Sequence, residues 1–300
     1  MKQGTRSSAA RLSVIILTYN EETNLPACLA SLDGLDGNLL VVDSGSTDRT
    51  VEIAAAAGAT VKVHPFEHYA TQRNWAQQQI PQDTEWVLHL DADERLTPEL
   101  VAEITTLLQD PPQHIAGYLL RKRTVFMGRW IKHRGHYPSY HLRLFRNGYG
   151  QCEERLYDQH FLVDGQVGTL RRDYIDVVTA DLDTWTLRHL RWAGLEACEA
   201  LANGQEGIRV QSTPFGDPIA HRRWLRDELY TRLPLFARAF LYWGYRYIVR
   251  LGFLDGKEGL IFHFLQGCWY RFLVDVRLDE ARKRLAGSST RREIHLREKA

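Results

Sequence analysis

Three short polar clusters in this chain could do chemistry, and each directly follows an apolar run. TYNEE begins at Thr18, DSGSTD begins at Asp43 and DADE begins at Asp91. Carboxylates can bind a hard cation such as Mg²⁺, which takes substrate phosphate oxygens among its other ligands. They can also accept hydrogen bonds from a nucleobase or from ribose hydroxyls. The clusters therefore indicate a site for a phosphorylated ligand held with a divalent cation.

The elements around these clusters alternate between strands and helices. Apolar, β-branched runs predict buried strands at 12–20, 38–43, 59–65 and 85–94. Helical spacing of apolar residues predicts helices at 21–32, 48–57, 69–79 and 98–108. Such alternation predicts an α/β fold with a mostly parallel central sheet and helices on both faces. Because ligands bind beyond the carboxyl ends of the strands in these sheets, we expect the three clusters to converge there.

Individual acids in the clusters also have structural interpretations. Asp93 or Glu94 could cap the helix that follows them, and Asp48 could cap the helix that begins beside it. We favour a capping role for Asp48 and a ligand-binding role for Asp43. Gly45, two residues after Asp43, would let a ligand approach the backbone closely.

Composition excludes several classes of protein. An apolar fraction of 44% and a charged fraction of 25% are ordinary for a globular chain, so disorder is excluded as its main character. Lys+Arg (38) and Asp+Glu (37) nearly cancel, so no overall basic field favours nucleic acid as a partner. The four cysteines lack CxxC spacing, and no apolar stretch is long enough for a signal peptide or a membrane-spanning helix. These features predict a cytoplasmic location.

Two apolar stretches near the C-terminus, 234–251 and 259–274, differ from the rest of the chain. On a helical wheel, Arg238, Arg246 and Arg250 lie on one side of the first stretch, and aromatic and aliphatic residues lie on the other. This pattern is typical of a helix lying in a membrane interface with its Arg side chains toward anionic headgroups. The alternative is a helical hairpin packed against the preceding domain or against a second copy of the chain in a homodimer.

Taken together, the motifs resemble those of a known enzyme family. The family 2 glycosyltransferases, which have the GT-A fold, are similar in the order and spacing of LSVIILTYNEETNL, VVDSGSTDRT and HLDADERL. The resemblance to one subgroup, the WaaE-type lipopolysaccharide-core and exopolysaccharide glycosyltransferases, extends over QRNWA, GRWIKHRGHYPSYHLRLFRNG and VDGQVGTL. The chain is therefore expected to have a GT-A type nucleotide-diphospho-sugar transferase fold, followed by a C-terminal amphipathic helical segment.

The resemblance also implies ligands and residue roles. The donor would be a nucleoside diphosphate sugar, with a UDP-sugar as the first choice, and the cofactor would be Mg²⁺ or Mn²⁺. The DXD motif would be formed by Asp91 and Asp93, which touch ribose, sugar and metal, while Asp43 would hold the base and Arg73 would reach the diphosphate or brace the DXD loop. The donor-binding residues implied in this way are Thr18, Tyr19, Asn20, Glu21, Asp43, Arg73 and Asp91.

Family 2 enzymes invert the anomeric centre, so the resemblance implies in-line attack by an acceptor hydroxyl and a base that takes its proton. The subgroup leads us to expect His-Glu at 158–159, where this chain has Asp158 and Gln159. An amide has no useful proton affinity, which excludes Gln159. Asp158 is the first candidate for the base, and Glu154 and Glu153 are the alternatives.

The stretch before Arg143 mixes aromatic and cationic residues, as is common where a sugar acceptor stacks on aromatic rings. Ordinary packing around a turn at Pro138 is the alternative interpretation. Arg143 itself lies in a strand-like pattern, LRLFR, with one face able to offer guanidinium groups to phosphate. The acceptor-side residues that we expect are Trp130, His136, Tyr137 and Arg143.

The expected organisation follows from these readings. We predict a flexible tail at 1–11, a catalytic domain at 12–225 with a donor half at 12–110 and an acceptor half at 111–225, a membrane-associated helical segment at 226–286 and a charged tail at 287–300. The predicted activity is hexose transfer to a lipid-linked saccharide or lipopolysaccharide-core acceptor at the inner face of the cell membrane, by a peripheral protein. The alternatives are a polyprenyl-phosphate glycosyltransferase and a non-catalytic, membrane-bound nucleotide-sugar-binding protein.

Overall fold

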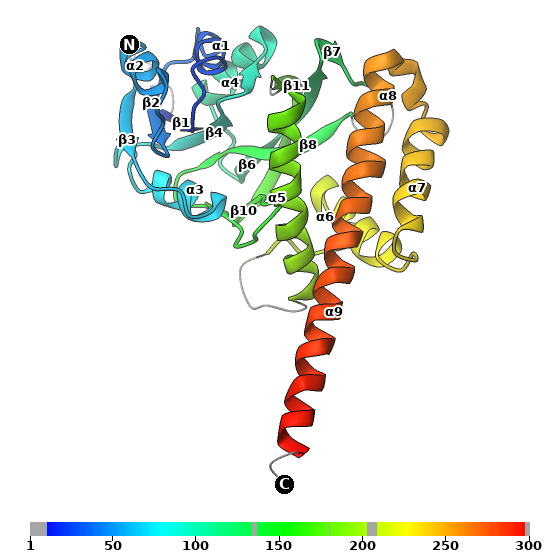
Figure 1. The fold of residues 1–300 in the computed structure, drawn as a ribbon. Helices are drawn as coiled ribbons and strands as arrows, with labels where there is room; N and C mark the ends of the chain where they lie inside the picture. Colours follow the sequence, from blue (N-terminus) through cyan, green and yellow to red (C-terminus); the bar gives the residue numbers. More distant parts are fainter. Residues whose placement is uncertain (1–10, 134–136, 180, 203–208, 298–300) are drawn as a thin grey trace, which may run out of the picture.

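The computed structural model describes residues 11–133, 137–179, 181–202 and 209–297, and its centre is one large sheet (Figure 1). Four parallel strands form one side of this sheet in the order β3-β2-β1-β4. Their bounds are β1 (Leu12–Thr18), β2 (Asn38–Asp43), β3 (Thr60–Val63) and β4 (Trp86–Asp91). The helices between and after them are α1 (Leu25–Ala30), α2 (Thr50–Ala56), α3 (Tyr69–Gln77) and α4 (Pro98–Gln109). The predicted alternation is confirmed, although α1 and α2 begin later than expected, at Leu25 and Thr50.

β1, β4 and the second half of β2 are buried on both faces, which is why they read as continuous apolar runs, whereas β3 at the edge of the sheet is largely exposed. On one face, Val14 and Leu88 pack with Leu25 of α1 and Leu100 of α4. On the other face, Ile15 and its neighbours pack with the alanines of α3. The carboxyl ends of β1, β2 and β4 therefore open at one edge of the sheet, between the two helical layers.

The second half of the sheet mixes strand directions. β8 (Ser139–Arg146) lies between β4 and β6 (Ile115–Phe126) and is antiparallel to both, and β11 (Gln166–Val178) is parallel to β6. β5 (Glu94–Leu96), directly after the DXD motif, pairs with β11 and places Glu94 opposite Asp176. The remaining strands are β7 (Arg129–Trp130), which pairs with β6, and the two-stranded pair β9 (Gly150–Cys152) and β10 (Phe161–Val163).

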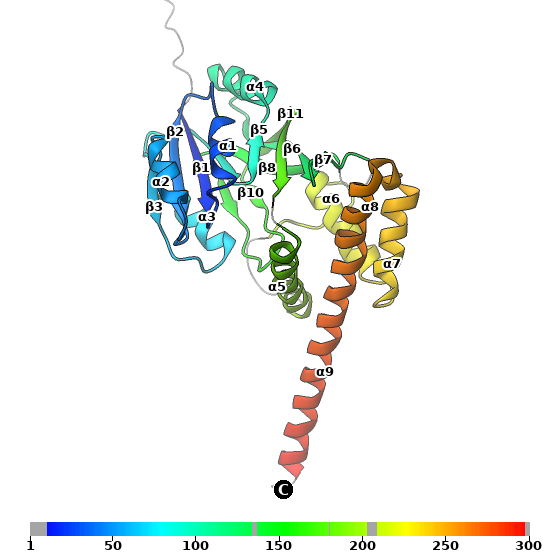
Figure 2. The same cartoon turned by 45° about the horizontal axis from the view of Figure 1, so that its top comes forward.

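A helical layer follows the sheet. Its elements are α5 (Leu182–Leu201), α6 (Pro218–Trp224), η1 (Leu225–Tyr230), α7 (Ala237–Gly244), η2 (Tyr245–Val249), η3 (Gly252–Asp255), α8 (Gly256–Phe264), η4 (Leu265–Trp269) and α9 (Tyr270–Arg297). α5 lies along α9, where Ala193 shares a core with Tyr270 and Val274. α9 then extends away from the sheet in both views (Figures 1 and 2). The α/β fold class of GT-A type, with a C-terminal helical segment, is confirmed, whereas the domain boundaries stay predictions.

The orientation that we predicted is wrong for two of the three C-terminal arginines. Arg238 and Arg246 are each only 5% exposed, because they face the protein. Arg238 forms a buried ion pair with Asp275 of α9, and the guanidinium of Arg246 lies 5.5 Å from the ring centre of Tyr242. The apolar side of α7 and η2 faces outward instead. None of the helices in the described ranges is long and apolar enough to cross a membrane.

A buried ion pair holds the loop between β9 and β10 onto α6. The carboxylate of Glu153, which is 0% exposed, accepts hydrogen bonds from both guanidinium nitrogens of Arg223 and from the backbone N–H groups of His160 and Val210. Burial would raise the pKa of Glu153, but the hydrogen bonds and charge of Arg223 outweigh it and lower the pKa below its usual 4.5. Glu153 is therefore a structural residue, and Glu154 beside it is exposed.

We expect Glu153→Ala to lower the free energy of unfolding by about 3–5 kcal/mol, because it leaves the Arg223 charge buried without its partner. Urea denaturation at neutral pH measures this loss. The matched change Glu154→Ala should shift stability by no more than about 0.5 kcal/mol. Because the pKa of Glu153 is lowered on folding, the difference between Glu153→Ala and the unsubstituted chain should shrink as the pH falls below 4.5. Equal stability of the two Ala variants would contradict this assignment.

Candidate functional site

The loops after β1 and β2 form one hydrogen-bonded unit at the carboxyl edge of the sheet. The Thr18 hydroxyl donates to Asp43 at 3.0 Å. The backbone N–H of Asn20 donates to the Ser46 hydroxyl at 2.8 Å, and the Asn20 side-chain oxygen accepts from the backbone N–H of Thr47 at 2.8 Å. TYNEE and DSGSTD are therefore brought together, as the sequence predicted.

Asp43 occupies the centre of this unit and is only 1% exposed. Its carboxylate accepts hydrogen bonds from the Thr18 hydroxyl, the backbone N–H groups of Gly45 (2.9 Å) and Ser46 (2.8 Å), and the Ser46 hydroxyl (2.5 Å). Four hydrogen bonds use the usual capacity of a carboxylate. In this arrangement Asp43 shapes the turn after β2, and its contact with a nucleobase stays a prediction.

Asp48 and Glu21 join the same two loops further out. Asp48 accepts from the N–H and hydroxyl of Thr50 at the start of α2 and from the N–H of Glu22 at 3.1 Å. The N-cap residue of α2 is Arg49, so the capping role predicted for Asp48 is wrong by one position. Glu21 accepts from the Asn24 amide at 2.7 Å, and burial raises its pKa. Both acids therefore help to fix the position of the loop that follows β1.

Two buried arginines hold the first acid of the DXD motif. The Arg73 guanidinium of α3 donates to Asp91 at 2.9 Å, and the Arg143 guanidinium of β8 donates to the other oxygen at 2.7 Å. Arg143 also donates to Glu94 at 2.5 Å, and Glu94 accepts from the backbone N–H of Asp91. Arg73 thus braces the DXD loop, one of its two predicted roles. Arg143 is buried here rather than facing an acceptor, which corrects its predicted position.

The two DXD carboxylates have opposite electrostatic environments. Burial would raise the pKa of Asp91, but the charges and hydrogen bonds of Arg143 and Arg73 hold it well below its usual range. Burial and repulsion by Asp176, Asp91 and neighbouring acids raise the pKa of Asp93 well above its usual range. Asp91 is therefore neutralised within the protein, whereas the negative charge of Asp93 needs a cation from outside it.

The donor set at Asp93 fits a hard divalent cation. Asp93 is half-buried, and no hydrogen bond or ion pair to its carboxylate is present among the described residues. Mg²⁺ commonly takes only one or two protein carboxylates and completes its shell with water and substrate phosphates. No cluster of three or more acidic, His or Cys ligands is found in the described part of the chain, so substrate oxygens would have to supply the other ligands.

Exposed aromatic and cationic side chains lie around this edge. Tyr19 is exposed, and Tyr69 lies beneath the Arg73 guanidinium, with 5.5 Å between the guanidinium carbon and the ring centre. Arg188 of α5 is close enough for its charge to lower the pKa of both Glu21 and Tyr69, although burial raises each of them. Sequence reasoning missed Arg188, because it lies in a different layer and about a hundred residues from the motifs.

Asp158 lies in the loop before β10 and is partly exposed. It pairs with Arg226 at 3.1 Å and lies 3.6 Å from the Nε2 atom of His160. Burial would raise the pKa of Asp158, but hydrogen bonding to His160 and the charges of His160 and Arg226 hold it well below its usual range. The next residue, Phe161, lies under the Arg73 guanidinium at 5.7 Å, which connects this loop to the Asp91 cluster.

The neighbours of Asp158 are less suited to act as a base. Glu153 is held in the buried ion pair with Arg223, and Gln159 donates its amide to the backbone oxygen of Arg155. Glu154 is exposed and remains an alternative. His160 was not expected at this position of the site, and the Asp158-Gln159-His160 spacing in the sequence is the signal that could have found it.

The predicted acceptor aromatics lie together beyond β6. The Trp130 and Tyr137 rings meet edge to face at 5.1 Å, and the Arg123 guanidinium lies over Trp130 at 4.6 Å. The Tyr137 hydroxyl donates to Asp173 at 3.0 Å. His136, the other predicted acceptor residue, lies outside the described residues. The cluster presents a ring face flanked by a cation, although packing remains an adequate explanation of the ring contacts.

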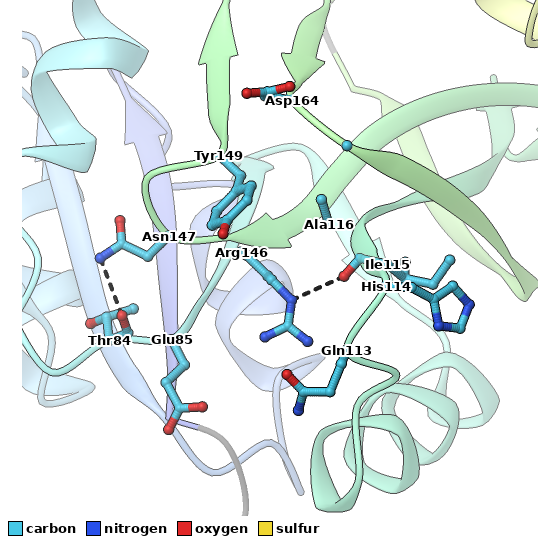
Figure 3. Close-up of a pocket in the computed structure, with 11 residues that line it drawn as sticks. Thr84, Glu85, Gln113, His114, Ile115, Ala116, Arg146, Asn147, Tyr149 and Asp164 are labelled. Carbon is cyan, nitrogen blue, oxygen red and sulfur yellow. Dashed lines mark hydrogen bonds between the residues drawn. The ribbon is translucent and has the colours of Figure 1, made fainter.

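A cavity of about 340 Å³ opens at the opposite edge of the sheet, where β4 begins and β8 ends (Figure 3). Within it, Arg146 donates to the backbone oxygen of Ile115 and Asn147 donates to that of Thr84 (Figure 3). Its polar side chains therefore brace the backbone, and the cavity is separate from the site at the carboxyl edge.

This chain is similar to several known proteins. An uncharacterized glycosyltransferase of Rickettsia conorii is 39% identical over 99 residues, which are 33% of this chain and 34% of that protein. A TPR repeat-containing protein of Synechococcus elongatus is 29% identical over 283 residues, covering 84% of this chain and 64% of that one. Among solved structures, S. aureus TarS 1–349 covers 91% of each chain with 17% identity and a TM-score of 0.46.

The matched part of the chain thus spans about a third of the length of the Rickettsia relatives. The family assignment comes from a broader match, because the sequence profile of glycosyl transferase family 2 covers residues 13–178. That range includes the strand ends, the DXD motif with both of its arginines, and the loop of Asp158. The chain belongs to glycosyl transferase family 2.

Proposed function

We propose that this glycosyltransferase transfers a hexose with inversion from a UDP-sugar to a hydroxyl of a lipid-linked saccharide or lipopolysaccharide-core acceptor. The observation that carries the proposal is the asymmetry of the DXD motif. Asp91 is paired with two buried arginines, whereas Asp93 carries an unpaired carboxylate at the edge where three strand ends meet. This is the arrangement needed to hold a cation and a diphosphate together.

The donor end of the site is formed by the loops after β1 and β2. Tyr19 is exposed at this edge and offers a ring face to the base. The turn held by Asp43 contains Gly45 at a φ of +90°, and nothing lies within 4 Å of the place where a Cβ would stand. A ligand can therefore approach the backbone there, as expected for the ribose and base of the donor.

Asp93, with Asp91 behind it, would hold Mg²⁺ or Mn²⁺. The cation would supply charge neutralisation of the diphosphate as it leaves. Arg188 faces the same edge and would add a second positive charge. Charge that develops on the leaving group is thus met by groups already in position, which is the largest contribution available to this reaction.

Asp158 is our assignment for the base. Because its pKa is held well below the usual 3.8, it is ionised throughout the neutral range and can accept the proton of an acceptor hydroxyl. Arg226 and His160 keep its position in the loop. A polyprenyl phosphate acceptor would already be anionic and would need no such base, so the retained carboxylate favours a hydroxyl acceptor.

Acceptor binding is assigned to the cluster of Trp130 and Tyr137. The Arg123 guanidinium covers one face of the Trp130 ring and pairs with Asp173 at 2.6 Å, so an acceptor sugar would stack on the other face of the ring. An acceptor of this kind on a lipid anchor would place the enzyme at the cytoplasmic face of the membrane as a peripheral protein. Assays with a water-soluble saccharide and with a polyprenyl phosphate distinguish the two acceptor classes.

Asp93→Asn should lower kcat with a UDP-sugar by at least about 10²-fold, because it removes the carboxylate that holds the cation against the leaving group. Turnover measured by release of UDP across a Mn²⁺ titration tests this. Asp36→Asn makes the same charge change on an exposed loop remote from the site and should have no effect. Full activity of Asp93→Asn would reject the metal assignment.

Asp158→Asn should lower kcat by about 10²–10⁴-fold and leave the KM for the donor within a few-fold, because a base acts only in the chemical step. Glu154→Gln, a change of the same kind four residues away, should leave both constants near their original values. The reverse pattern would move the base to Glu154. In the unsubstituted enzyme, kcat/KM should not fall through protonation of the base until the pH is below 3.8.

Arg188→Gln should raise the KM for the UDP-sugar by about 10-fold, because a charge-assisted contact to phosphate contributes about 1.5–3 kcal/mol. Steady-state kinetics at low and high salt measures the change. Arg191→Gln, which alters an exposed Arg one turn later on α5, is the control. Identical kinetics of the two variants would show that Arg188 does not meet the donor.

A further inference from the structure

The outward side of the helical hairpin α7–η2–η3–α8 is apolar. Along α7 and η2, the exposed side chains Leu241, Tyr245, Ile248 and Val249 follow the spacing of a single helical face. Ile248 is 60% exposed and Val249 is 66% exposed. Continuous exposed apolar surface of this kind marks a site of interaction with another surface. We call the exposed apolar side chains between 240 and 264 the hairpin face.

The hairpin face continues across the turn and onto α8. The turn contributes exposed side chains from Leu251, Phe253 and Leu254, and α8 contributes Leu260 and Phe264. Two aromatic contacts tie these parts to α7 and η2. Phe264 meets Trp243 edge to face at 6.2 Å, and Phe253 meets Tyr247 at 6.3 Å. The exposed residues of the turn and of α8 therefore border the same helix that carries Ile248 and Val249.

Buried charges hold the hairpin in this orientation. Arg238 pairs with Asp275 of α9, and Arg246 lies against the rings of Tyr242 and Phe262. Turning the apolar side inward would expose those rings and separate a buried ion pair, which is strongly destabilising. The hairpin face is therefore the stable outward surface of this chain, not a surface left open by a loose helix.

The charges around the hairpin face are predominantly positive. Of the five basic residues between 233 and 274, Arg238 and Arg246 face the protein and Arg271 pairs with Glu196, which leaves Lys257 and Arg250 beside the hairpin face. The two acids in this range are Asp255 and Glu258. Asp255 is buried, and Glu258 lies 3.7 Å from Arg129. Lys257 is exposed, and Arg250 donates to the hydroxyl of Tyr245 at the edge of the face. Apolar side chains bordered by cations are complementary to an anionic bilayer surface.

A second copy of the chain is a less suitable occupant. A two-fold dimer would pack the hairpin face against a copy of itself, which adds further cations but only two acids, one of them the buried Asp255 and the other Glu258 beside Arg129. A bilayer with anionic lipids offers an apolar layer and opposite charge at once. Charge complementarity therefore favours the bilayer.

The hairpin also holds the candidate acceptor segment. Asp255 at its turn accepts hydrogen bonds from the backbone N–H of His133 at 3.1 Å and from the His133 ring. Phe126, at the end of β6, packs against Phe262 of α8 at 5.4 Å. The strand pair β6–β7, which carries Trp130, is therefore attached directly to the hairpin.

We infer that the hairpin face inserts into the interfacial layer of an anionic membrane, with Lys257 and Arg250 at the headgroups, and that it holds the Trp130 segment beside the membrane surface. The position of the acceptor segment rests on the proposed function. The insertion itself rests only on the exposed side chains and charges of the hairpin.

The test compares two matched variants of the full chain. Val249→Glu adds a charge to the hairpin face. Val63→Glu is the control, because Val63 is 65% exposed and lies on β3, the edge strand far from α7 and α8 (Figure 1). Co-sedimentation uses vesicles made of equal parts of phosphatidylcholine and phosphatidylglycerol. We expect Val249→Glu to lower binding at least about 10-fold, because a buried carboxylate is disfavoured in the interface, and Val63→Glu to bind as the unsubstituted chain does.

A separate variant tests how much positive charge contributes to vesicle binding. Lys257→Gln should weaken binding to these vesicles about five-fold, as expected for one basic residue near an anionic surface, and should not alter the weaker binding to pure phosphatidylcholine. Unchanged binding of both Val249→Glu and Lys257→Gln would overturn the inference. So would failure of the unsubstituted chain to bind anionic vesicles, or a dimer in gel filtration that Val249→Glu converts to a monomer.

Turnover separates this inference from the proposed function. UDP-sugar hydrolysis in the absence of vesicles should be the same for Val249→Glu, Val63→Glu and the unsubstituted chain, and equal circular dichroism spectra show that the variants fold. Loss of vesicle binding with hydrolysis retained supports the inference. If the unsubstituted chain binds vesicles but turns over no UDP-sugar, the result contradicts the proposed function and still supports membrane binding by the hairpin face.

Discussion

The structure depends on the ion pairs that Arg73 and Arg143 form with Asp91. A buried guanidinium is costly unless a charged partner compensates for its lost hydration. Here the two buried arginines come from α3, which precedes β4 in the chain, and from β8, which follows it. These contacts therefore join the parallel half of the sheet to the antiparallel half. Phe161, which lies under the Arg73 guanidinium, connects the loop of Asp158 to the same cluster.

The same ion pairs give the two DXD acids different electrostatic environments. Asp91 has its charge cancelled inside the protein, so it can act as a fixed support. Asp93 is surrounded by acids that raise its pKa, and in the proposed function its charge would be stabilised by a cation that binds with the donor. The loop would then be most favourable electrostatically with cation and diphosphate present together, which couples their binding.

In the C-terminal hairpin, buried charges also find partners inside the protein, and here the result is an exposed apolar surface. Its arginines find Asp275 and aromatic rings within the protein, and this leaves the apolar side chains on the outside. An amphipathic helix is usually expected to turn its charges outward. Here internal partners for the charges reverse that expectation, and Asp255 connects the reversed helix to the strand pair that carries Trp130.

The sequence by itself determined the alternating strands and helices, the convergence of three polar clusters and the family, because periodicity and motif spacing are local properties of the chain. Only the tertiary structure decided which charges meet. It paired Arg143 with Asp91 rather than leaving it to face an acceptor. The carboxylate of Asp43 accepts hydrogen bonds from its own turn, and Arg238 faces the protein. Periodicity tells which residues share a face of an element, but the partner of that face is chosen by packing between segments far apart in the chain. For charged side chains, that partner decides whether the residue binds a ligand, supports a loop or holds a helix in place.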